Sequence, residues 1–277
     1  MRLLLVRHGE TVDNVAGLYA GVRDSPLTAH GVLQARRLAS HLATRSALIG
    51  SVTHVFSSDL QRAANTAQAI IDAQSPHQGP FSLAMPDRAQ VRLVKVPELR
   101  ERNFGSAEGK RFGTPRADAE THEEMRVRAA TFVRTQLEPV MARGAGQRGV
   151  VVVVSHGILL NSLLRVLLMR YAPEELARLS AAARSEYLAS WSNTGYCEMA
   201  VRNVATPQPP SGGKAPAIPS RLELVLIGSN MTTHLDGLKK TRGGIGSSQF
   251  DSRQRSMDAF LAPSAKKRRI EGNSKGN

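Results

Sequence analysis

Cysteine is almost absent from this chain, which has one in 277 residues. A single thiol, Cys197, cannot form an internal disulfide bond, and this scarcity favours a reducing compartment. Cys197 lies in an apolar stretch, Gly195 to Val201, that is typical of a strand. We therefore expect a packed core thiol there and not a nucleophile.

Long hydrophobic runs are also missing. No stretch approaches the ~18 uncharged apolar residues that a membrane-spanning helix needs, so we expect no membrane partner. The apolar N-terminus, Met1 to Val6, is too short for a secretory signal, and Arg7 follows it at once. We see no internal repeats and no cluster with the usual spacing of metal ligands, so neither a metal nor another cofactor is expected.

Acidic residues are few beside basic ones, with 23 Asp and Glu against 37 Lys and Arg, a formal charge of +14. From Lys239 to the end there are ten basic and three acidic residues, which places +7 in the last 39 positions. A basic tail suggests nucleic acid, an import receptor or an acidic partner. The excess in the rest of the chain indicates, more weakly, an anionic substrate.

Apolar periodicity predicts the main elements. Helical spacing occurs in four stretches: Val32 to Leu42, Ala63 to Ile71, Thr121 to Met141 and Ile158 to Met169. They alternate with short apolar strands, and two more strands follow the last helix. Residues 76–86 and 206–217 are rich in Pro and Gly, which predicts surface loops. We expect one domain over residues 1–235 and a basic, largely disordered tail over residues 236–277.

Two of the predicted strands end in a histidine followed by glycine. The run Leu3 to Val6 leads into Arg7-His8-Gly9, and the run from Val150 to Val154 leads into Ser155-His156-Gly157. Such runs are typical of buried parallel strands, and ligands bind outside the carboxyl ends of these strands. We expect His8 and His156 to meet in one pocket, as nucleophile, acid or base, or metal ligands.

A third strand end adds another cation to this pocket. Ser58 and Gln61 have the spacing of a capping box, which would place Arg62 in the first turn of a helix. Backbone N–H groups at a helix N-terminus attract anions, and a guanidinium matches two phosphoryl oxygens. Arg7 and Arg62 beside two histidines therefore predict a phosphate pocket.

At this point the sequence resembles the histidine phosphatase superfamily, which is also called phosphoglycerate mutase-like. The resemblance rests on four segments in the family's order and covers roughly residues 1–228: Arg7 to Thr11, Ser57 to Ala67, Glu101 to Gly105 and Ser155 to Gly157. Together with the alternating strands and helices, it predicts a three-layer α/β sandwich with a mainly parallel central sheet flanked by helices.

The resemblance also implies roles for individual residues. His8 would attack phosphorus and carry the phosphoryl group. Glu101 would protonate the leaving oxygen and later deprotonate water. The phosphoryl oxygens would be held by Arg7, Arg62 and His156, with Asn14 as a further donor. Gly21 and Arg23 are candidate substrate contacts.

Physical chemistry supports a nucleophilic His8 independently. The attacking imidazole must be neutral, and the permanent cations Arg7 and Arg62 lower its pKa. The same charges stabilise the transition state of phosphoryl transfer. The second ring nitrogen must be held, for which a backbone carbonyl is the expected partner.

Each assignment has an alternative. Glu10, Glu98 and Glu108 are further candidates for the acid, although Glu101 takes the family's acid position. As alternatives to phosphate binding, His156 could cap the helix that follows it, Arg62 could be a solvated helix residue, and Asn14 could be a turn residue. The remaining histidines are expected to be non-catalytic because none follows a strand in this way: His30, His41, His54, His77, His122 and His234.

The spacing of the segments favours hydrolysis over mutase chemistry. Only 55 positions separate Glu101 from His156, whereas mutases of the resembled family have a long insertion there. Water is therefore expected to attack the phosphorylated histidine. Lys110, Arg111 and Arg116 either hold a second acidic group of the substrate or form a solvated basic loop.

The tail contains two short motifs. Gln254, Met257, Phe260 and Leu261 resemble the PIP box that binds sliding clamps, although Leu261 stands where an aromatic residue is usual. Met257 and Phe260 would share one face of a helical turn. Lys266-Lys267-Arg268-Arg269 resembles a nuclear localisation signal. Clamp binding and an import receptor are thus candidate interactions, and the nucleus, the cytoplasm or both are the expected locations.

Three functions follow from these observations. The first is a metal-independent phosphomonoester hydrolase, which acts on a phosphorylated small molecule or a phosphoprotein through phosphohistidine at His8. The second is a nuclear interaction protein that its tail recruits and that has weak or no catalysis. The third is a phosphoglycerate mutase-type phosphotransferase. The joint presence of Arg7, His8, Arg62, Glu101 and His156 favours the first.

Overall fold

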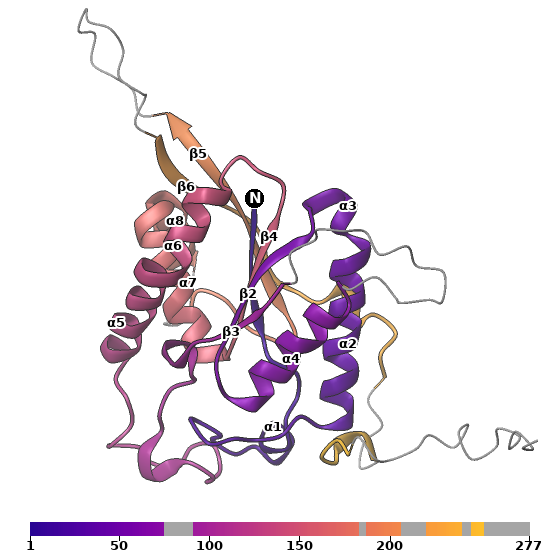
Figure 1. Cartoon of the computed structure of the whole chain (residues 1–277). Coiled ribbons are helices and arrows are strands. Elements are labelled where there is room, and N and C mark those ends of the chain that lie inside the picture. The colour runs from indigo at the N-terminus through magenta and orange to yellow at the C-terminus, as the bar shows by residue number, and fades with distance from the viewer. Residues whose placement is uncertain (75–90, 183–186, 206–219, 240–244, 252–277) are drawn as a thin grey trace, which may run out of the picture.

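The protein is a six-stranded sheet between two layers of helices (Figure 1). A computed structural model describes residues 1–74, 91–182, 187–205, 220–239 and 245–251. The strand order is β3-β2-β4-β1-β5-β6. The predicted three-layer α/β architecture with a mainly parallel sheet is confirmed.

The parallel part of the sheet contains β1 (Arg2–Arg7), β2 (Val52–Ser57), β3 (Leu93–Lys95) and β4 (Val150–Ser155). The antiparallel strands β5 (Tyr196–Ala205) and β6 (Ser220–Met231) extend it on the far side of β1. Because β1 and β4 lie at the centre, their carboxyl ends are next to each other.

Helices cover both faces of the sheet, as Figure 1 shows. One face carries α5 (His122–Phe132), α6 (Glu138–Gly144) and α7 (Gly157–Tyr171), with α8 (Pro173–Ala182) against α7. The other carries α2 (Ala29–Thr44) and α4 (Gln61–Asp72). Two short helices, α1 (Val12–Ala16) and α3 (Ser46–Ile49), lie in the connections. Within the described part of the chain, no helix is long and apolar enough to cross a membrane.

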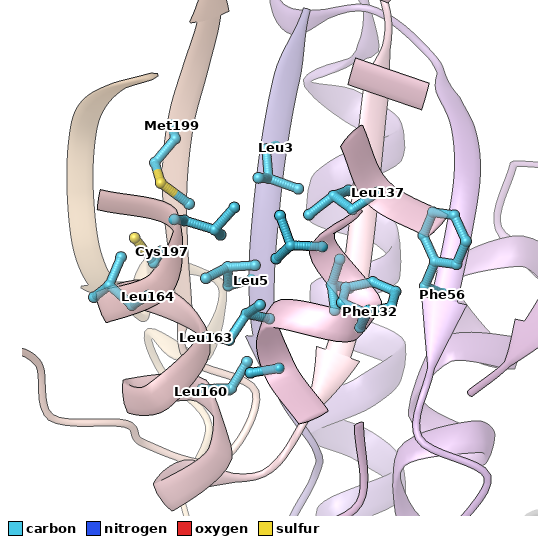
Figure 2. Close-up of a cluster of buried hydrophobic side chains, with 14 of the residues drawn as sticks. Leu3, Leu5, Phe56, Phe132, Leu137, Leu160, Leu163, Leu164, Cys197 and Met199 are labelled. Atoms are coloured by element: carbon cyan, nitrogen blue, oxygen red, sulfur yellow. The ribbon is translucent and has the colours of Figure 1, made fainter. Parts of the chain in front are cut away.

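The central strands β1 and β4 each contain an unbroken apolar run, Leu3 to Val6 and Val150 to Val154, because both faces of the sheet are buried there. Leu3 and Leu5 point into the core under α5 and α7, where they pack with Phe132 and Leu163 (Figure 2). Leu4, the residue between them, belongs to the second core under α2 and α4. Hydrophobic packing on two sides therefore fixes the ends of β1 and β4.

The segment predicted as one helix from Thr121 to Met141 is not uniform. A π-helical turn, Val133–Leu137, separates α5 from α6. Pro139 stands in the first turn of α6, and proline has no N–H to continue the α-helical hydrogen bonds. Two acidic residues, Glu123 and Glu124, lie in the first turn of α5, where Thr121 and Glu124 form a capping box.

The capping box predicted at the start of α4 is wrong. Leu60 is the N-cap residue and makes no side-chain cap, and the Ser58 hydroxyl accepts from the Leu60 amide at 3.3 Å. The Gln61 amide donates instead to the carboxylate of Asp24, at 2.8 Å. Asp24, which lies 37 positions before Gln61, thus caps the N-terminus of α4 in place of the predicted local motif.

Gly9 and Gly31 allow the end of β1 to lie directly against α2. A Cβ atom on Gly31 would be 2.1 Å from the Glu10 carbonyl oxygen, and one on Gly9 would be 2.5 Å from the Gly31 carbonyl oxygen. The amide of Gly9 also donates to the Thr66 hydroxyl of α4 at 3.1 Å. These contacts hold the backbone that follows His8 between α2 and α4.

Part of the segment predicted as tail contacts the domain. The Ala29 amide donates to the Ser248 carbonyl, and the Phe250 amide donates to the Leu27 carbonyl. The predicted loops at residues 76–86 and 206–217 lie outside the described residues, and so do both tail motifs, including Gln254, Met257, Phe260, Leu261, Lys266, Lys267, Arg268 and Arg269. The motifs, their partners and the proposed localisation remain predictions.

Candidate active site

His8 and His156 lie side by side at the carboxyl edge of the sheet. Arg7 and Ser155, the last residues of β1 and β4, are paired in register, and the histidines follow them directly. The two ring centroids are 5.0 Å apart. The expected meeting of the two strand-end histidines is confirmed.

The ring of His8 is buried and held in one tautomer. Its Nδ1 lies 2.7 Å from the Gly9 carbonyl oxygen, which only accepts, so Nδ1 carries the proton and Nε2 keeps its lone pair. The pKa of His8 lies well below its ordinary value, mainly because burial disfavours the charged form and further because Arg62 and Arg7 repel it. The expected effect of the two arginines is present, and burial, which the sequence did not indicate, is the larger cause. His8 therefore presents a neutral nitrogen with a free electron pair.

His156 has the opposite tautomer. The Nε of Arg62 donates to His156 Nδ1 at 3.2 Å, so the ring proton lies on Nε2. Burial, then Arg62, lowers the pKa of His156 well below the ordinary range. Its Nε2 is buried and has no hydrogen-bond partner among the described residues. His156 thus offers an unused N–H donor beside His8.

Arg62 is 1% exposed, which is unusual for an arginine and rules out the solvated helix residue considered above. Its two terminal nitrogens donate to the carbonyls of Gly21 at 2.6 Å and Arg23 at 2.7 Å. Each terminal nitrogen retains a second N–H, since an NH₂ group carries two hydrogens. The guanidinium is therefore held in place and still has donors for an anion.

Arg7 is anchored in a similar way. Its terminal nitrogen donates to the Trp191 carbonyl at 2.6 Å, while its buried Nε has no partner in the described structure. Burial lowers the pKa of the Arg7 guanidinium, and the carboxylate of Glu101 opposes this shift. An arginine in proteins stays charged, so the site holds two buried cations.

Glu101 lies at the N-terminus of α7 and lines the same cavity as Arg7, His8 and Arg62. Its carboxylate accepts the backbone amides of Leu159 at 3.1 Å and Ile158 at 3.3 Å. The helix thereby directs the carboxylate toward the two cations.

The other carboxylates that could act as the acid are directed elsewhere. Glu10 accepts the Thr28 hydroxyl at 2.9 Å, and Glu108 accepts the backbone amide of Val22 at 2.9 Å. Neither of these residues nor Glu98 is among the residues that line the cavity. Of the four candidates, the structure brings only Glu101 to the histidines.

Arg128 of α5 positions Glu101 and was not identified from the sequence. Its guanidinium donates to the carbonyls of Glu98, Arg100 and Glu101 and pairs with the Glu120 carboxylate. An arginine that binds three carbonyls of one turn fixes the backbone path of that turn. The helical periodicity of this stretch contains no signal for such a contact.

Asn14 lines the cavity, but its amide oxygen is occupied. The oxygen accepts the Thr11 amide at 3.3 Å and the Asn193 side-chain amide at 3.1 Å. Asn193 also donates to the His8 carbonyl at 3.2 Å, so it ties the nucleophile's backbone to Asn14. Sequence reasoning missed Asn193 because it precedes a strand and belongs to none of the four segments.

The remaining candidates are divided between the cavity and its surroundings. Gly21 lines the cavity, whereas Arg23 contributes its carbonyl to Arg62 and is itself exposed. Arg116 donates to the Tyr19 hydroxyl at 2.6 Å and lies over its ring, so it is not a solvated loop residue. Cys197 is fully buried, as expected, and burial raises its pKa to about 12.

The cavity has a volume of about 570 Å³ and is largely apolar outside its charged base. Its apolar and aromatic lining comes from Leu18, Tyr19, Phe104, Phe112, Ile158, Tyr187, Leu188 and Trp191. Across the described ranges, no group of three His, Cys, Asp or Glu residues is placed to hold a metal ion. What the site offers is two neutral imidazoles, two guanidinium groups and one carboxyl group.

Neutral buried histidines make folding stability depend on pH. Below about pH 6.5 an unfolded histidine gains a proton, while folded His8 and His156 stay neutral, so stability is full above this pH and falls below it. At pH 5.5 each of these two histidines should lower the free energy of unfolding by about 1.4 kcal/mol relative to its value at neutral pH.

Urea unfolding at pH 7.5 and 5.5 measures this loss. The wild type should have a lower free energy of unfolding at pH 5.5 than at pH 7.5, and His8→Gln should make this difference smaller by about 1.4 kcal/mol. Equal pH dependence in the wild type and His8→Gln would contradict a neutral His8 in the folded protein.

Residues 3–202 match the model of the histidine phosphatase superfamily, branch 1. The chain is 31% identical over 216 residues to the probable phosphoglycerate mutase GpmB of Proteus mirabilis, which covers 71% of this chain and 90% of that protein. It is 29% identical over 271 residues to a probable phosphatase of Schizosaccharomyces pombe, covering 94% of this chain and 79% of the relative.

Solved structures share the fold. A mycobacterial hydrolase superposes with a TM-score of 0.58 at 21% identity, covering 84% of this chain and 99% of that one. A mycobacterial glucosyl-3-phosphoglycerate phosphatase in complex with VO3 superposes with a TM-score of 0.57 at 20% identity, covering 83% of this chain and 98% of that one. The phosphoserine phosphatase of Entamoeba histolytica, in complex with 3-phosphoglyceric acid, superposes with a TM-score of 0.52 at 21% identity, covering 84% of this chain and 98% of that one.

Proposed function

The chain belongs to the histidine phosphatase superfamily, and on this premise we propose that it hydrolyses phosphomonoesters through a phosphohistidine at His8. Its relatives include probable phosphatases and probable phosphoglycerate mutases. The proposal assigns this chain to the hydrolases and gives a role to His8, Glu101 and the three residues that hold the phosphoryl group.

In the first step the phosphoryl group lies between Arg7, Arg62 and His156. The lone pair of His8 Nε2 attacks phosphorus, so a nitrogen–phosphorus bond forms while the bond from phosphorus to the alcohol oxygen breaks. Glu101, protonated at this stage, gives its proton to the leaving oxygen. The guanidinium groups stabilise the charge on the equatorial oxygens.

In the second step a water molecule replaces the released alcohol. Glu101, now a carboxylate, takes a proton from the water as its oxygen attacks phosphorus. The nitrogen–phosphorus bond breaks, its electron pair returns to His8 Nε2, and inorganic phosphate leaves. Glu101 is again protonated and His8 is again neutral, so the site is ready for another ester.

The observation that carries this proposal is a pair of unused buried donors beside the nucleophile. Arg7 Nε and His156 Nε2 have no hydrogen-bond partner in the described part of the protein. Leaving such donors buried and unpaired costs free energy, typically about 1–3 kcal/mol each. A phosphoryl group whose oxygens accept from both donors removes that cost.

The proposal is tested by assaying p-nitrophenyl phosphate and a panel of alkyl phosphates with excess chelator present. We expect hydrolysis that the chelator leaves unchanged, because arginines and not a metal balance the charge in this proposal. Acid-labile phosphate on the protein during turnover would support the phosphohistidine. Absence of hydrolysis across the whole panel contradicts the proposal.

Mutase chemistry is the second candidate because of the likeness to probable phosphoglycerate mutases. Product analysis separates the two activities. A phosphatase releases inorganic phosphate from 2- or 3-phosphoglycerate, whereas a mutase interconverts them and releases little. The length of chain between Glu101 and His156 favours release.

A further inference from the structure

Resting on this proposed function, we infer that the site selects phosphomonoesters of apolar, aromatic alcohols over those of anionic alcohols such as phosphoglycerate. The inference comes from the walls of the cavity beyond the phosphate position. Three observations support it: the position of the cations, the construction of the aromatic wall, and the exposure of apolar side chains at the cavity.

The cations that line the cavity are all at its base. Arg7 and Arg62 are the only Lys or Arg residues among its described lining, and both are assigned to the transferred phosphoryl group. Glu101, a further ionisable residue with a catalytic role in this lining, supplies no positive charge either. A substrate with a second anionic group would therefore meet no further Lys or Arg among the described residues that line the cavity, to offset its loss of hydration.

One wall of the cavity is a preformed group of aromatic rings. The Tyr19 ring lies 4.5 Å from Phe104 and 5.0 Å from Phe112, measured between centroids. The Tyr19 hydroxyl accepts from the Gly113 amide at 3.0 Å and from Arg116 at 2.6 Å. These bonds hold the hydroxyl, the only polar group of the Tyr19 side chain, so the ring that it offers the cavity is fixed in place.

Backbone hydrogen bonds hold this wall together. The Phe112 amide donates to the Gly17 carbonyl at 2.9 Å, and the Tyr19 amide donates to the Lys110 carbonyl at 2.9 Å. Two segments distant in sequence are thus joined beside the cavity. Arg116, which once stood as a candidate for binding a second acidic group, lies over the rings of Tyr19 and Phe104 and is part of this wall.

The remaining apolar lining comes from the start of α7 and the segment before β5. Ile158, Tyr187, Leu188 and Trp191 contribute it. Trp191 is anchored because its carbonyl accepts from Arg7, so this lining is tied to the phosphate position itself. An ester bound at the base would place its alcohol part among these side chains.

Two of the lining side chains expose a large apolar surface to solvent. Phe112 is 58% exposed and Tyr187 is 39% exposed. Apolar area that is lost to water on binding favours association, and flat rings stack on one another with further gain. An aromatic alcohol part would cover this surface, whereas a short polar one would not.

The test compares three esters with similar alkoxide leaving groups: benzyl phosphate, glycerol 3-phosphate and 3-phosphoglycerate. Their similar leaving groups remove the advantage that aryl phosphates have from a good leaving group. We expect kcat/KM for benzyl phosphate to exceed that for 3-phosphoglycerate by at least about tenfold, since apolar contacts of this size give such ratios. A ratio near one, or a preference for 3-phosphoglycerate, overturns the inference.

Phe112→Ala tests the wall directly. It should lower kcat/KM about three- to tenfold for benzyl phosphate, mostly through KM, and leave glycerol 3-phosphate nearly unchanged. Phe250→Ala is the matched control, because Phe250 is also partly exposed but lies against Arg36 of α2. An equal loss for both esters, or an equal effect of the two variants, overturns the role of this wall.

Phosphoramidate separates this inference from the proposed function, because it carries a phosphoryl group and no alcohol part. If phosphoramidate phosphorylates His8 but benzyl phosphate is not preferred, the inference is wrong and the phosphohistidine proposal stands. If phosphoramidate does not phosphorylate the protein and no ester is hydrolysed, the proposed function fails first, and the inference fails with it.

Discussion

Replacement of His8 by alanine is expected to lower kcat/KM for p-nitrophenyl phosphate by at least about 10³-fold. The change removes the only protein atom that forms a bond to phosphorus in the proposed mechanism, and among the described residues no second imidazole offers a free electron pair in the same position. His156 cannot substitute, because its hydrogen-bond pattern places the proton on the nitrogen beside the substrate. Steady-state assays of purified wild type and variant measure the loss.

The His8→Ala result needs a readout that separates chemistry from folding. His8 is 4% exposed, so its replacement leaves a small cavity, and thermal unfolding shows whether the variant is still folded. Phosphate incorporation from ³²P-labelled substrate should disappear in the variant. His54→Ala, at an exposed histidine of β2, should keep both activity and incorporation. A folded His8→Ala protein with more than a tenth of wild-type activity would show that another group is the nucleophile.

Replacement of Glu101 by glutamine is expected to lower kcat by about 10²- to 10⁴-fold, the usual contribution of a general acid or base. Glutamine keeps the size of the side chain and one oxygen that accepts the Leu159 amide, although the Ile158 amide loses its carboxylate partner. It cannot donate and recover a proton as the carboxyl group does. The variant should therefore remain folded while turnover becomes slow.

The leaving group separates the two roles of Glu101. With p-nitrophenyl phosphate the departing oxygen needs little protonation, so Glu101→Gln should still form phosphohistidine but hydrolyse it slowly. The phosphorylated protein should accumulate and be visible after rapid quenching. With benzyl phosphate the first step also slows, so little should accumulate. If kcat is unchanged while the unfolding temperature falls, Glu101 serves only as the N-terminal cap of α7.

The sequence could predict those features that depend on buried strands. The apolar runs of β1 and β4 lie between two hydrophobic cores, and such runs are typical of the buried centre of a parallel sheet. Parallel pairing then puts the residues after both strands at one edge. That is sufficient to bring His8 and His156 together before any contact is known.

Features that depend on distant contacts could not be predicted. Asp24 caps α4 from another segment, and Asn193 ties Asn14 to the His8 backbone across more than 170 positions. Neither contact produces a hydrophobic periodicity or a local motif that the sequence would show. The dominance of burial over charge at His8 is of the same kind, because the number of atoms around a side chain is a property of the complete fold.

Cys197 has a practical consequence for studying this protein in solution. With a pKa of about 12 and no exposed surface, its thiol is ionised at neutral pH only to about one part in 10⁵. The native chain therefore behaves toward maleimides and iodoacetamides as if it had no cysteine at all. A fluorophore or spin label attached to one cysteine introduced at position 112 would report on the cavity alone, with the wild-type core left intact.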